Sequence, residues 1–381
     1  MKAPFLVLLI LIAGVAGIPL AGAQTAIPAP PAIGATSYLL MDHDTGAVLV
    51  ESNADERVEP ASLTKIMTAY AVFREIAAGK LSAADEVLIS EKAWRTEGSR
   101  TFLDVGSRVS VDDLLMGMIV QSGNDASVAL AEHIAGSEAA FAGLMNAHAQ
   151  RLGAVNSRFT NATGLPDPEL YTTARDIALI ASAVIREFPE EYGRYKVKEF
   201  VYNDIRQSNR NRLLFRDESV DGMKTGYTAA AGYCLVASAQ RDGMRLISVV
   251  MGTSGAEQRA RDSLALLNYG FRFYESHRLY EGGAPVQRLR VWQGRQAEVP
   301  IGPSQDVHVT IPRGRYPQLG AALDPVLGRE APVASGERLG TIIVSLDGQE
   351  VLRVPAVALE EVPRGNLWRR LVDSVLRMVQ S

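Results

Sequence analysis

A lysine inside an otherwise apolar helix constrains the fold of this chain more than any other feature of the sequence. Ser62 and Lys65 stand three residues apart where the stretch PASLTKIMTAY, residues 60–70, begins a predicted helix. The positions that follow are apolar on nearly every side: Ile66, Met67, Ala69, Tyr70, Val72, Phe73 and Ile76. Such a helix is buried in a folded domain, and a buried ammonium group needs partners or a lowered pKa. We therefore expect an enclosed helix in which Lys65 has a chemical role.

That role follows from the spacing between the serine and the lysine. Residues three apart on a helix share one face, so the amine of Lys65 can reach the hydroxyl of Ser62. A free lysine has a pKa of about 10.4 and is almost fully protonated at neutral pH. Burial lowers that pKa, and so does a nearby cation, for which Lys224 is the candidate. Lys65 can then accept the proton of Ser62, which activates the serine without a histidine.

Two further polar segments, each in apolar surroundings, complete the constellation. Ser122-Gly123-Asn124 lies in a predicted break between two apolar helices, and Lys224-Thr225-Gly226 lies on a predicted strand. The backbone N–H groups of Ser62 and of Tyr227 are candidate donors to an oxyanion, the first because it lies at a helix start. Each segment alone is a weak signal. All three in this order are the motif set of the class A β-lactamases and penicillin-binding proteins.

The chain divides into four predicted segments. Residues 1–23 have the basic start, apolar run and small-residue end of a secretory signal peptide, with a retained membrane anchor as the alternative. Residues 24–283 place helices between strands, which predicts an α+β domain whose antiparallel sheet is covered by helices. Within it, Ser254 and Glu257 predict the start of a helix that reaches about residue 275. Residues 284–362 carry short apolar runs separated by glycine and proline, which indicate a small all-β domain.

The last segment, residues 363–381, predicts an amphipathic helix. Its apolar face comprises Leu367, Trp368, Leu371, Val372, Val375, Leu376 and Val379. Arginines at 364, 369, 370 and 377 with one aspartate, Asp373, give the segment a net charge of +3. An apolar face with cations suits peripheral contact with an anionic membrane. Packing of this helix against the all-β domain is the alternative.

Composition excludes several classes of function. The 39 basic and 43 acidic residues nearly balance, which argues against a nucleic-acid partner. The five histidines are scattered, and HExxH, CxxC, GxxxxGK[ST] and GxGxxG motifs are absent from the sequence, so we expect no metal and no cofactor. A single cysteine, Cys234, allows no internal disulfide and fits a small core residue. Asp44-Thr45-Gly46 matches half of an aspartic protease, but a hairpin turn explains it better.

The sequence resembles the low-molecular-mass penicillin-binding proteins that are serine-type D-alanyl-D-alanine carboxypeptidases, the group around penicillin-binding protein 5. The resemblance covers nearly the whole chain after the signal peptide. It implies a penicillin-binding, serine β-lactamase-like catalytic domain, a β-domain that acts as a spacer, and a tail helix that anchors to the membrane. It is carried by the segments EPASLTKIMTAY, MIVQSGNDASVALAE, QSNRNRLLF, VDGMKTGYTAAAGYCLVASA, MRLISVVMG, LLNYGFRFYE and VHVTIPRGR.

The same resemblance implies roles for individual residues. Ser62 is the nucleophile that becomes acylated and Lys65 its base, while Ser122 passes a proton to the leaving amine. Asn124 contacts the peptide bonds of the substrate. The resemblance also implies that Lys224 supports Ser122 and the substrate carboxylate, and that Thr225 and Arg259 bind that carboxylate. Arg210 is implied to lie near the site. Tyr227 departs from the histidine that relatives often carry, but its backbone N–H suffices for the oxyanion.

The implied reaction removes the terminal D-alanine from the peptidoglycan pentapeptide, with β-lactams as covalent inhibitors. The resemblance and the signal-peptide pattern together predict a location outside the cytoplasm, on the periplasmic face of the inner membrane. Three alternatives stay open. A β-lactamase would need a deacylating glutamate, for which the loop NATGLPDPELYTTARD offers Glu169. A peptidoglycan-binding protein without catalysis would be expected to lack Ser62 or Lys65, and an endopeptidase acting on crosslinked peptides would share the chemistry.

Overall fold

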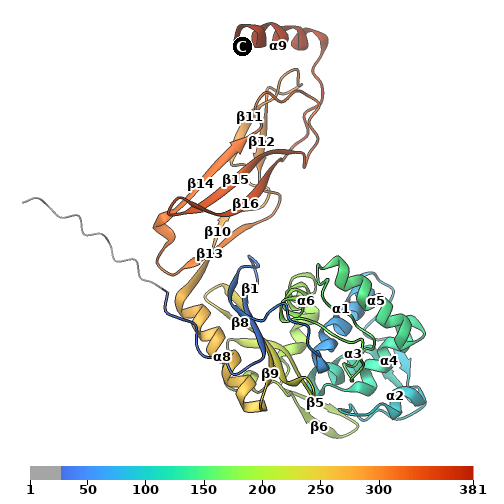
Figure 1. The fold of residues 1–381 in the computed structure, drawn as a ribbon. Helices are drawn as coiled ribbons and strands as arrows, with labels where there is room; N and C mark the ends of the chain where they lie inside the picture. Colours follow the sequence, from blue (N-terminus) through green and yellow to red (C-terminus); the bar gives the residue numbers. More distant parts are fainter. Residues whose placement is uncertain (1–26, 381) are drawn as a thin grey trace, which may run out of the picture.

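The structure, a computed structural model, describes residues 27–380. The predicted signal peptide, residues 1–23, lies outside the described residues and stays a prediction. Figure 1 shows an elongated arrangement: a mixed helix-and-sheet part at one end, a β-sheet part in the middle, and helix α9 at the other end. Among the described residues, no helix is both long and apolar enough to cross a membrane.

A five-stranded antiparallel sheet forms the centre of the first part, in the order β2-β1-β9-β8-β7. Its strands are β1 Ser37–Asp42, β2 Val48–Ser52, β7 Val220–Thr228, β8 Gly232–Arg241 and β9 Met244–Thr253. The turn between β1 and β2 contains the Asp44-Thr45-Gly46 segment, and the backbone N–H groups of Asp44 and Thr45 donate to the carboxylate of Asp42. The hairpin interpretation of that segment is therefore confirmed.

Both faces of this sheet are buried because its strands alternate two sets of apolar residues. On β9, Ile247, Val249 and Met251 belong to the larger core around α1, whereas Leu246 and Val250 pack in a second core with α8. The buried helix α1 spans Thr64–Ala77 and is enclosed from Thr64 to Phe73, as the sequence predicted. The other helices of this part are α2 Glu91–Arg95, α3 Val111–Met116, α4 Asn124–Ala135, α5 Glu138–Arg151, α6 Ala174–Glu187, α7 Pro189–Tyr192 and α8 Ala256–Phe273.

The helix expected after Ser254 is α8, but its N-terminal cap differs from the prediction. Gly255 is its N-cap, and the cap makes no side-chain hydrogen bond, so the expected capping box of Ser254 and Glu257 is wrong. The carboxylate of Glu257 instead binds the guanidinium of Arg216 at 2.6 Å. The helix ends at Phe273, and strand β10 (Tyr274–Tyr280) follows directly.

The β part begins with that strand, before the boundary expected at residue 284. Strand β10 pairs with β13 (Val307–Pro312), and a separate five-stranded sheet has the order β11-β12-β16-β15-β14. A third apolar core, separate from the two of the first part, fills this region. The strands of the second sheet are β11 Gln287–Arg290, β12 Glu298–Gly302, β14 Leu319–Pro325, β15 Arg338–Leu346 and β16 Gln349–Ala358.

Shorter elements complete the first part. Two-stranded ribbons pair β3 Glu86–Leu88 with β4 Arg108–Ser110, and β5 Glu199–Tyr202 with β6 Ile205–Ser208. A 3₁₀ turn, η1 (Ala61–Leu63), leads into α1, and a π turn, η2 (Gly117–Gln121), ends α3. The turn η1 contains Ser62 of the first motif, and η2 directly precedes Ser122 of the second.

Candidate active site

Lys65 makes three hydrogen-bond contacts at the buried start of α1. Its Nζ lies 3.1 Å from the Ser62 Oγ, 2.7 Å from the Asn124 Oδ1 and 2.6 Å from the carbonyl oxygen of Thr163. A neutral lysine amine has two N–H donors and one lone pair. The Asn124 Oδ1 and the Thr163 carbonyl oxygen, at the two shorter distances, accept those two hydrogens, which leaves the lone pair facing the hydroxyl of Ser62. The contacts therefore suit a neutral Lys65 that accepts a proton from Ser62.

The electrostatic surroundings favour that neutral form. Burial, and after it the positive charge of Arg210, lowers the pKa of Lys65 to about 7. The cation expected from the sequence was Lys224, so Arg210 is a correction. Lys224 is itself buried, and desolvation together with the charge of Lys65 holds its pKa well below the usual range. A charged Lys65 thus disfavours the charged form of Lys224.

Ser122 and Gly123 lie in the break between η2 and α4, where the sequence predicted them, and Asn124 is the first residue of α4. Ser122 has a left-handed backbone conformation, with φ of 69°, which is uncommon outside glycine. Its Oγ accepts a hydrogen bond of 2.8 Å from the Nζ of Lys224. Strained backbone positions of this kind gather at functional sites because the surrounding fold must hold them in place.

Strand β7 lies against the turn that carries Ser62. A Cβ added to Gly226 would lie 3.3 Å from the backbone nitrogen of Ser62 and 3.2 Å from the carbonyl of Pro60. The absence of a side chain at this position lets the strand approach η1 closely. The two predicted oxyanion donors, the N–H groups of Ser62 and Tyr227, therefore come from adjoining segments.

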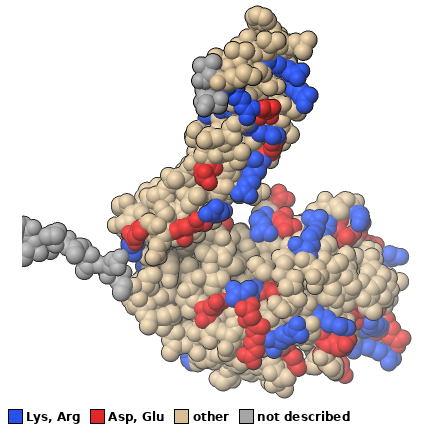
Figure 2. All heavy atoms as spheres, turned by 45° about the horizontal axis from the view of Figure 1, so that its top comes forward, with Lys and Arg blue, Asp and Glu red and all other residues tan. Residues whose placement is uncertain are grey.

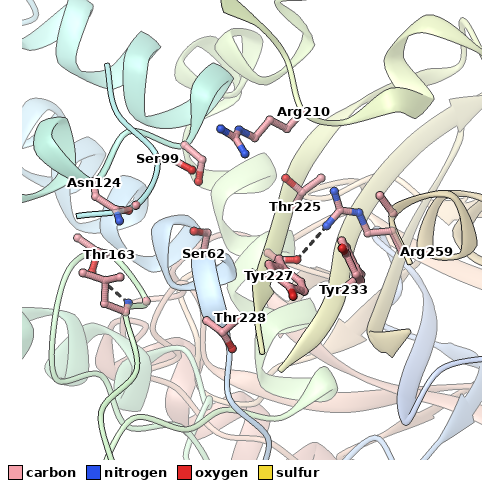
Figure 3. Close-up of a pocket in the computed structure, with 16 residues that line it drawn as sticks. Ser62, Ser99, Asn124, Thr163, Arg210, Thr225, Tyr227, Thr228, Tyr233 and Arg259 are labelled. Atoms are coloured by element: carbon pink, nitrogen blue, oxygen red, sulfur yellow. Dashed lines mark hydrogen bonds between the residues drawn. The ribbon is translucent and has the colours of Figure 1, made fainter. Parts of the chain in front are cut away.

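A cavity of about 530 Å³ joins these groups. In Figure 3, Ser62 lies between Asn124 on one side and Thr225 with Arg259 on the other. The guanidinium of Arg259 donates to the carbonyl of Gly226 at 2.9 Å and lies over the ring of Tyr233. Among the described residues, no aspartate or glutamate lines the cavity. The lining residues are Ser62, Gly98, Ser99, Ser122, Asn124, Thr163, Gly164, Leu165, Arg210, Thr225, Gly226, Tyr227, Thr228, Tyr233, Ala256 and Arg259.

Known proteins are similar to this chain in sequence and in fold. Residues 24–255 match the peptidase S11 family model, described as D-alanyl-D-alanine carboxypeptidase, and residues 274–364 match the penicillin-binding protein 5 C-terminal domain. The chain is 45% identical to the D-alanyl-D-alanine carboxypeptidase DacC of Escherichia coli over 91% of this chain and 88% of that protein. DacA of the same organism is 44% identical over 93% and 90% of the two chains. The chain belongs to the S11 family of D-alanyl-D-alanine carboxypeptidases.

A solved structure leads to the same assignment. Penicillin-binding protein 5 from Haemophilus influenzae superposes with a TM-score of 0.85 at 42% identity, over 88% of this chain and 100% of that chain. The family predicted from the motifs is confirmed, and so are the fold class and the enzyme class. The roles of the individual site residues stay predictions.

In this carboxypeptidase, one buried carboxylate that the sequence analysis did not consider organises the site. Asp125, directly after Asn124, is 1% exposed and accepts hydrogen bonds from the backbone N–H groups of Thr101, Phe102 and Leu103. The carbonyl of Glu97, just before this loop, accepts from the side-chain amide of Asn124. Asp125 thereby fixes the loop that orients Asn124. The sequence signals this role by an acidic residue that stands directly after the motif, within an apolar helix.

The 161–165 loop is a second contribution that the sequence analysis did not identify. The Oδ1 of Asn161 accepts from the backbone N–H groups of Thr163 and Gly164, which shapes the loop. This shape aims the carbonyl of Thr163 at Lys65. Further along the same segment, Glu169 is exposed and paired with Arg158 at 2.7 Å. It does not line the cavity, so the glutamate considered for a β-lactamase is not in position.

Proposed function

We propose that Ser62 is the nucleophile and Lys65 the general base of D-alanine release from peptidoglycan pentapeptides. The observation that carries the proposal is the set of contacts around the Nζ of Lys65. The neutral amine donates its two hydrogens to Asn124 and Thr163, and its lone pair faces the Ser62 Oγ, which is 3.1 Å away. A base with a pKa of about 7 is well matched to proton transfer at neutral pH.

The reaction proceeds through an acyl-enzyme. As the Ser62 Oγ bonds to the carbonyl carbon of the penultimate D-alanine, its proton passes to the Nζ of Lys65. The oxyanion that forms accepts hydrogen bonds from the N–H groups of Ser62 and Tyr227. The C–N bond then breaks as the departing nitrogen takes the hydroxyl proton of Ser122, which Lys224 holds at 2.8 Å. The proton that Lys65 received replaces it on Ser122, so that Lys65 is neutral again. Water then attacks the ester and gives a proton to Lys65, and the Ser62 oxygen takes this proton as it leaves, which restores Ser62 and frees the shortened peptide.

The cationic side of the cavity suits the free carboxylate of the substrate. Arg259 and Arg210 both line the cavity, and Thr225 lies beside Arg259 in Figure 3. Burial lowers the pKa of both guanidinium groups, since desolvation disfavours their charge. A carboxylate bound here would offset that unfavourable burial. We assign Thr225, Lys224 and Arg259 to the carboxylate end and Asn124 to the peptide bonds.

The experiment that tests this function measures D-alanine released from a pentapeptide that ends in D-Ala-D-Ala, and covalent labelling by a fluorescent penicillin. Ser62→Ala should abolish both, and Lys65→Ala should slow acylation by orders of magnitude while the protein stays folded. Because the cavity lining holds no carboxylate for a second water-activating path, the penicillin adduct should persist for minutes. Rapid turnover of penicillin without an adduct would favour a β-lactamase.

We further propose that the protein is exported and attaches peripherally to the periplasmic face of the inner membrane through α9. The signal-peptide pattern of residues 1–23 and the apolar, cationic tail support this location. We place the division between the catalytic domain and the β-domain at the junction of α8 and β10, because β10 pairs with β13 of the β part. The β-domain would then separate the catalytic cavity from the membrane.

A further inference from the structure

Within the part of the chain that the structure describes, the largest apolar exposure is concentrated at the end that carries α9. Among the described residues, the four most exposed large apolar side chains are Leu367 at 80%, Leu327 and Met378 at 79%, and Trp368 at 76%. Three of them belong to α9 (Leu367–Gln380), but Leu327 belongs to the loop after β14. In Figure 2, this end of the molecule is largely uncharged, with basic side chains beside it. Contiguous apolar exposure of this kind marks an interaction surface.

The Leu327 loop lies beside α9. Gly328 lies against the guanidinium of Arg377, and Arg377 forms an ion pair with Glu330 of the same loop. Val326, on the other side of Leu327, is 50% exposed. The loop and the helix therefore present apolar side chains from neighbouring positions of one end of the molecule.

The polar side of α9 is docked on the β-domain. Asp373 is 6% exposed, and its carboxylate accepts from the backbone N–H of Gln293 at 2.6 Å and from Arg290 at 3.3 Å. Together with the Arg377–Glu330 pair, these contacts form what we call the tail clasp. Because the clasp uses the polar side, the apolar side of the helix faces away from the β-domain. Packing of α9 against the β-domain and contact of α9 with a membrane, which the sequence left as alternatives, are thus compatible.

The clasp also explains how α9 can persist in water. A helix of fourteen residues is marginal on its own, since most helical stability comes from tertiary packing. Here the packing surface is polar, so the helix can be ordered without covering its apolar face. Asp373 and Arg377 are neutralised by the β-domain, and Arg364, Arg369 and Arg370 form no ion pair within residues 27–380. The tail cations that remain suit an anionic surface.

We propose that the lipid-binding surface is composite: α9 and the 326–328 loop of the β-domain contact the anionic bilayer together, and the tail clasp holds them in one orientation. This inference rests on the proposed membrane contact. In it, the tail is a preformed part of a rigid surface, and Leu327 inserts beside α9. The β-domain then takes part in the contact directly.

The first test compares binding to vesicles of phosphatidylethanolamine with phosphatidylglycerol. Leu327→Asp should weaken partitioning of the full-length mature protein by about tenfold or more, because insertion of one leucine contributes about that factor. Leu88→Asp is the matched control, since Leu88 is 59% exposed on the catalytic domain, and it should leave partitioning unchanged. Equal binding of Leu327→Asp and wild type would overturn the composite surface.

The second test addresses the clasp with variants that leave the tail sequence intact. In the absence of lipid, Arg290→Gln with Glu330→Gln should accelerate amide hydrogen exchange of residues 367–380 by roughly tenfold or more, because the helix loses its packing. Arg353→Gln breaks an exposed pair with Glu350 on the same domain, 2.7 Å apart, and should not alter this exchange. A tail that exchanges equally fast in wild type and variants would overturn the clasp.

These outcomes separate the inference from the proposal beneath it. If the wild type does not bind the vesicles at all, the membrane contact itself fails. If the wild type binds and Leu327→Asp binds equally, the tail alone is the anchor. Light scattering checks a further occupant: a wild-type dimer that Leu327→Asp dissociates would show that a second copy of the chain covers this surface, which also overturns the inference.

Discussion

At the scale of single residues, the site depends on the protonation of one buried amine. The amine of Lys65 donates two hydrogens to Asn124 and Thr163. Its third position, toward Ser62, holds either a lone pair or a third hydrogen, and only with the lone pair can Lys65 act as a base. Spacing in the sequence predicted the Ser62–Lys65 contact, because three residues on a helix is a local relation. The partners Asn124 and Thr163 are 59 and 98 residues away, and such relations depend on the tertiary fold.

The first prediction concerns pH. The pKa of Lys65 is lowered to about 7, so the amine is mostly neutral above that pH and mostly charged below it. The second-order rate of acylation by a fluorescent penicillin should therefore rise between pH 6 and pH 8, with a midpoint near 7, and then level off. Stopped-flow measurement of adduct formation checks this. A rate that stays constant from pH 5 to pH 9 would contradict Lys65 as the base.

The second prediction concerns Gly164, which lies under the turn that carries Ser62. Its φ is +79°, and an added Cβ would lie 1.7 Å from the carbonyl oxygen of Ala61. Gly164→Ala should displace η1 and reduce acylation at least tenfold, in addition to a backbone penalty of about 1 kcal/mol. Gly153→Ala is the matched control, because Gly153 has a φ of +81° with nothing within 4 Å of the added carbon. Comparable acylation by the two variants would show that the turn tolerates the displacement.

At the scale of elements, the sequence predicted those with a clear apolar pattern. The apolar helix α1 and the strand that carries Lys224-Thr225-Gly226, β7, were predicted in this way, and the structure confirms both. Strands β12 and β14 of the β-domain carry no such pattern: β12 is short and contains Pro300, and β14 is mostly exposed at the sheet edge. Neither has the buried alternation that identifies a strand in a sequence.

The third prediction concerns the loop that Asp125 fixes. Asp125→Ala would leave the backbone N–H groups of residues 101–103 without their acceptor, and should lower the free energy of unfolding by about 3 kcal/mol. It should also slow acylation, since the same loop orients Asn124. Asp85→Ala is the control: the exposed side chain of Asp85 accepts one such bond, from Ser82. Chemical denaturation of both variants gives the comparison, and equal stabilities would show that Asp125 has no special role.

At the scale of the whole molecule, the proposed catalytic and membrane functions lie at opposite ends. Figure 1 places α2 to α5 at one end and α9 at the other, with the β-domain between them. The catalytic motifs lie between Ser62 and Arg259, whereas the tail clasp joins α9 to residues 290–330. The cavity and the tail therefore share no contact, and each should function without the other.

The fourth prediction uses that separation. A protein truncated before Pro363 should release D-alanine from a soluble pentapeptide with an unchanged kcat/KM, because no group that lines the cavity is removed. It should move from the membrane fraction to the soluble fraction, because the apolar face of α9 and the tail cations are lost together. Truncation also removes Pro363, Asp373 and Arg377. It leaves the side chains of Arg290 and Glu330, and the backbone N–H groups of Gln293 and Arg295, without the tail groups that they bind. Removal of the tail opens these groups to water, which replaces the lost partners, so the loss should lower stability by only about 1 kcal/mol. Once cleavage of the signal peptide is confirmed, a truncated protein that stays in the membrane fraction would place the anchor elsewhere. A truncated protein with reduced kcat/KM would show that the two ends are coupled.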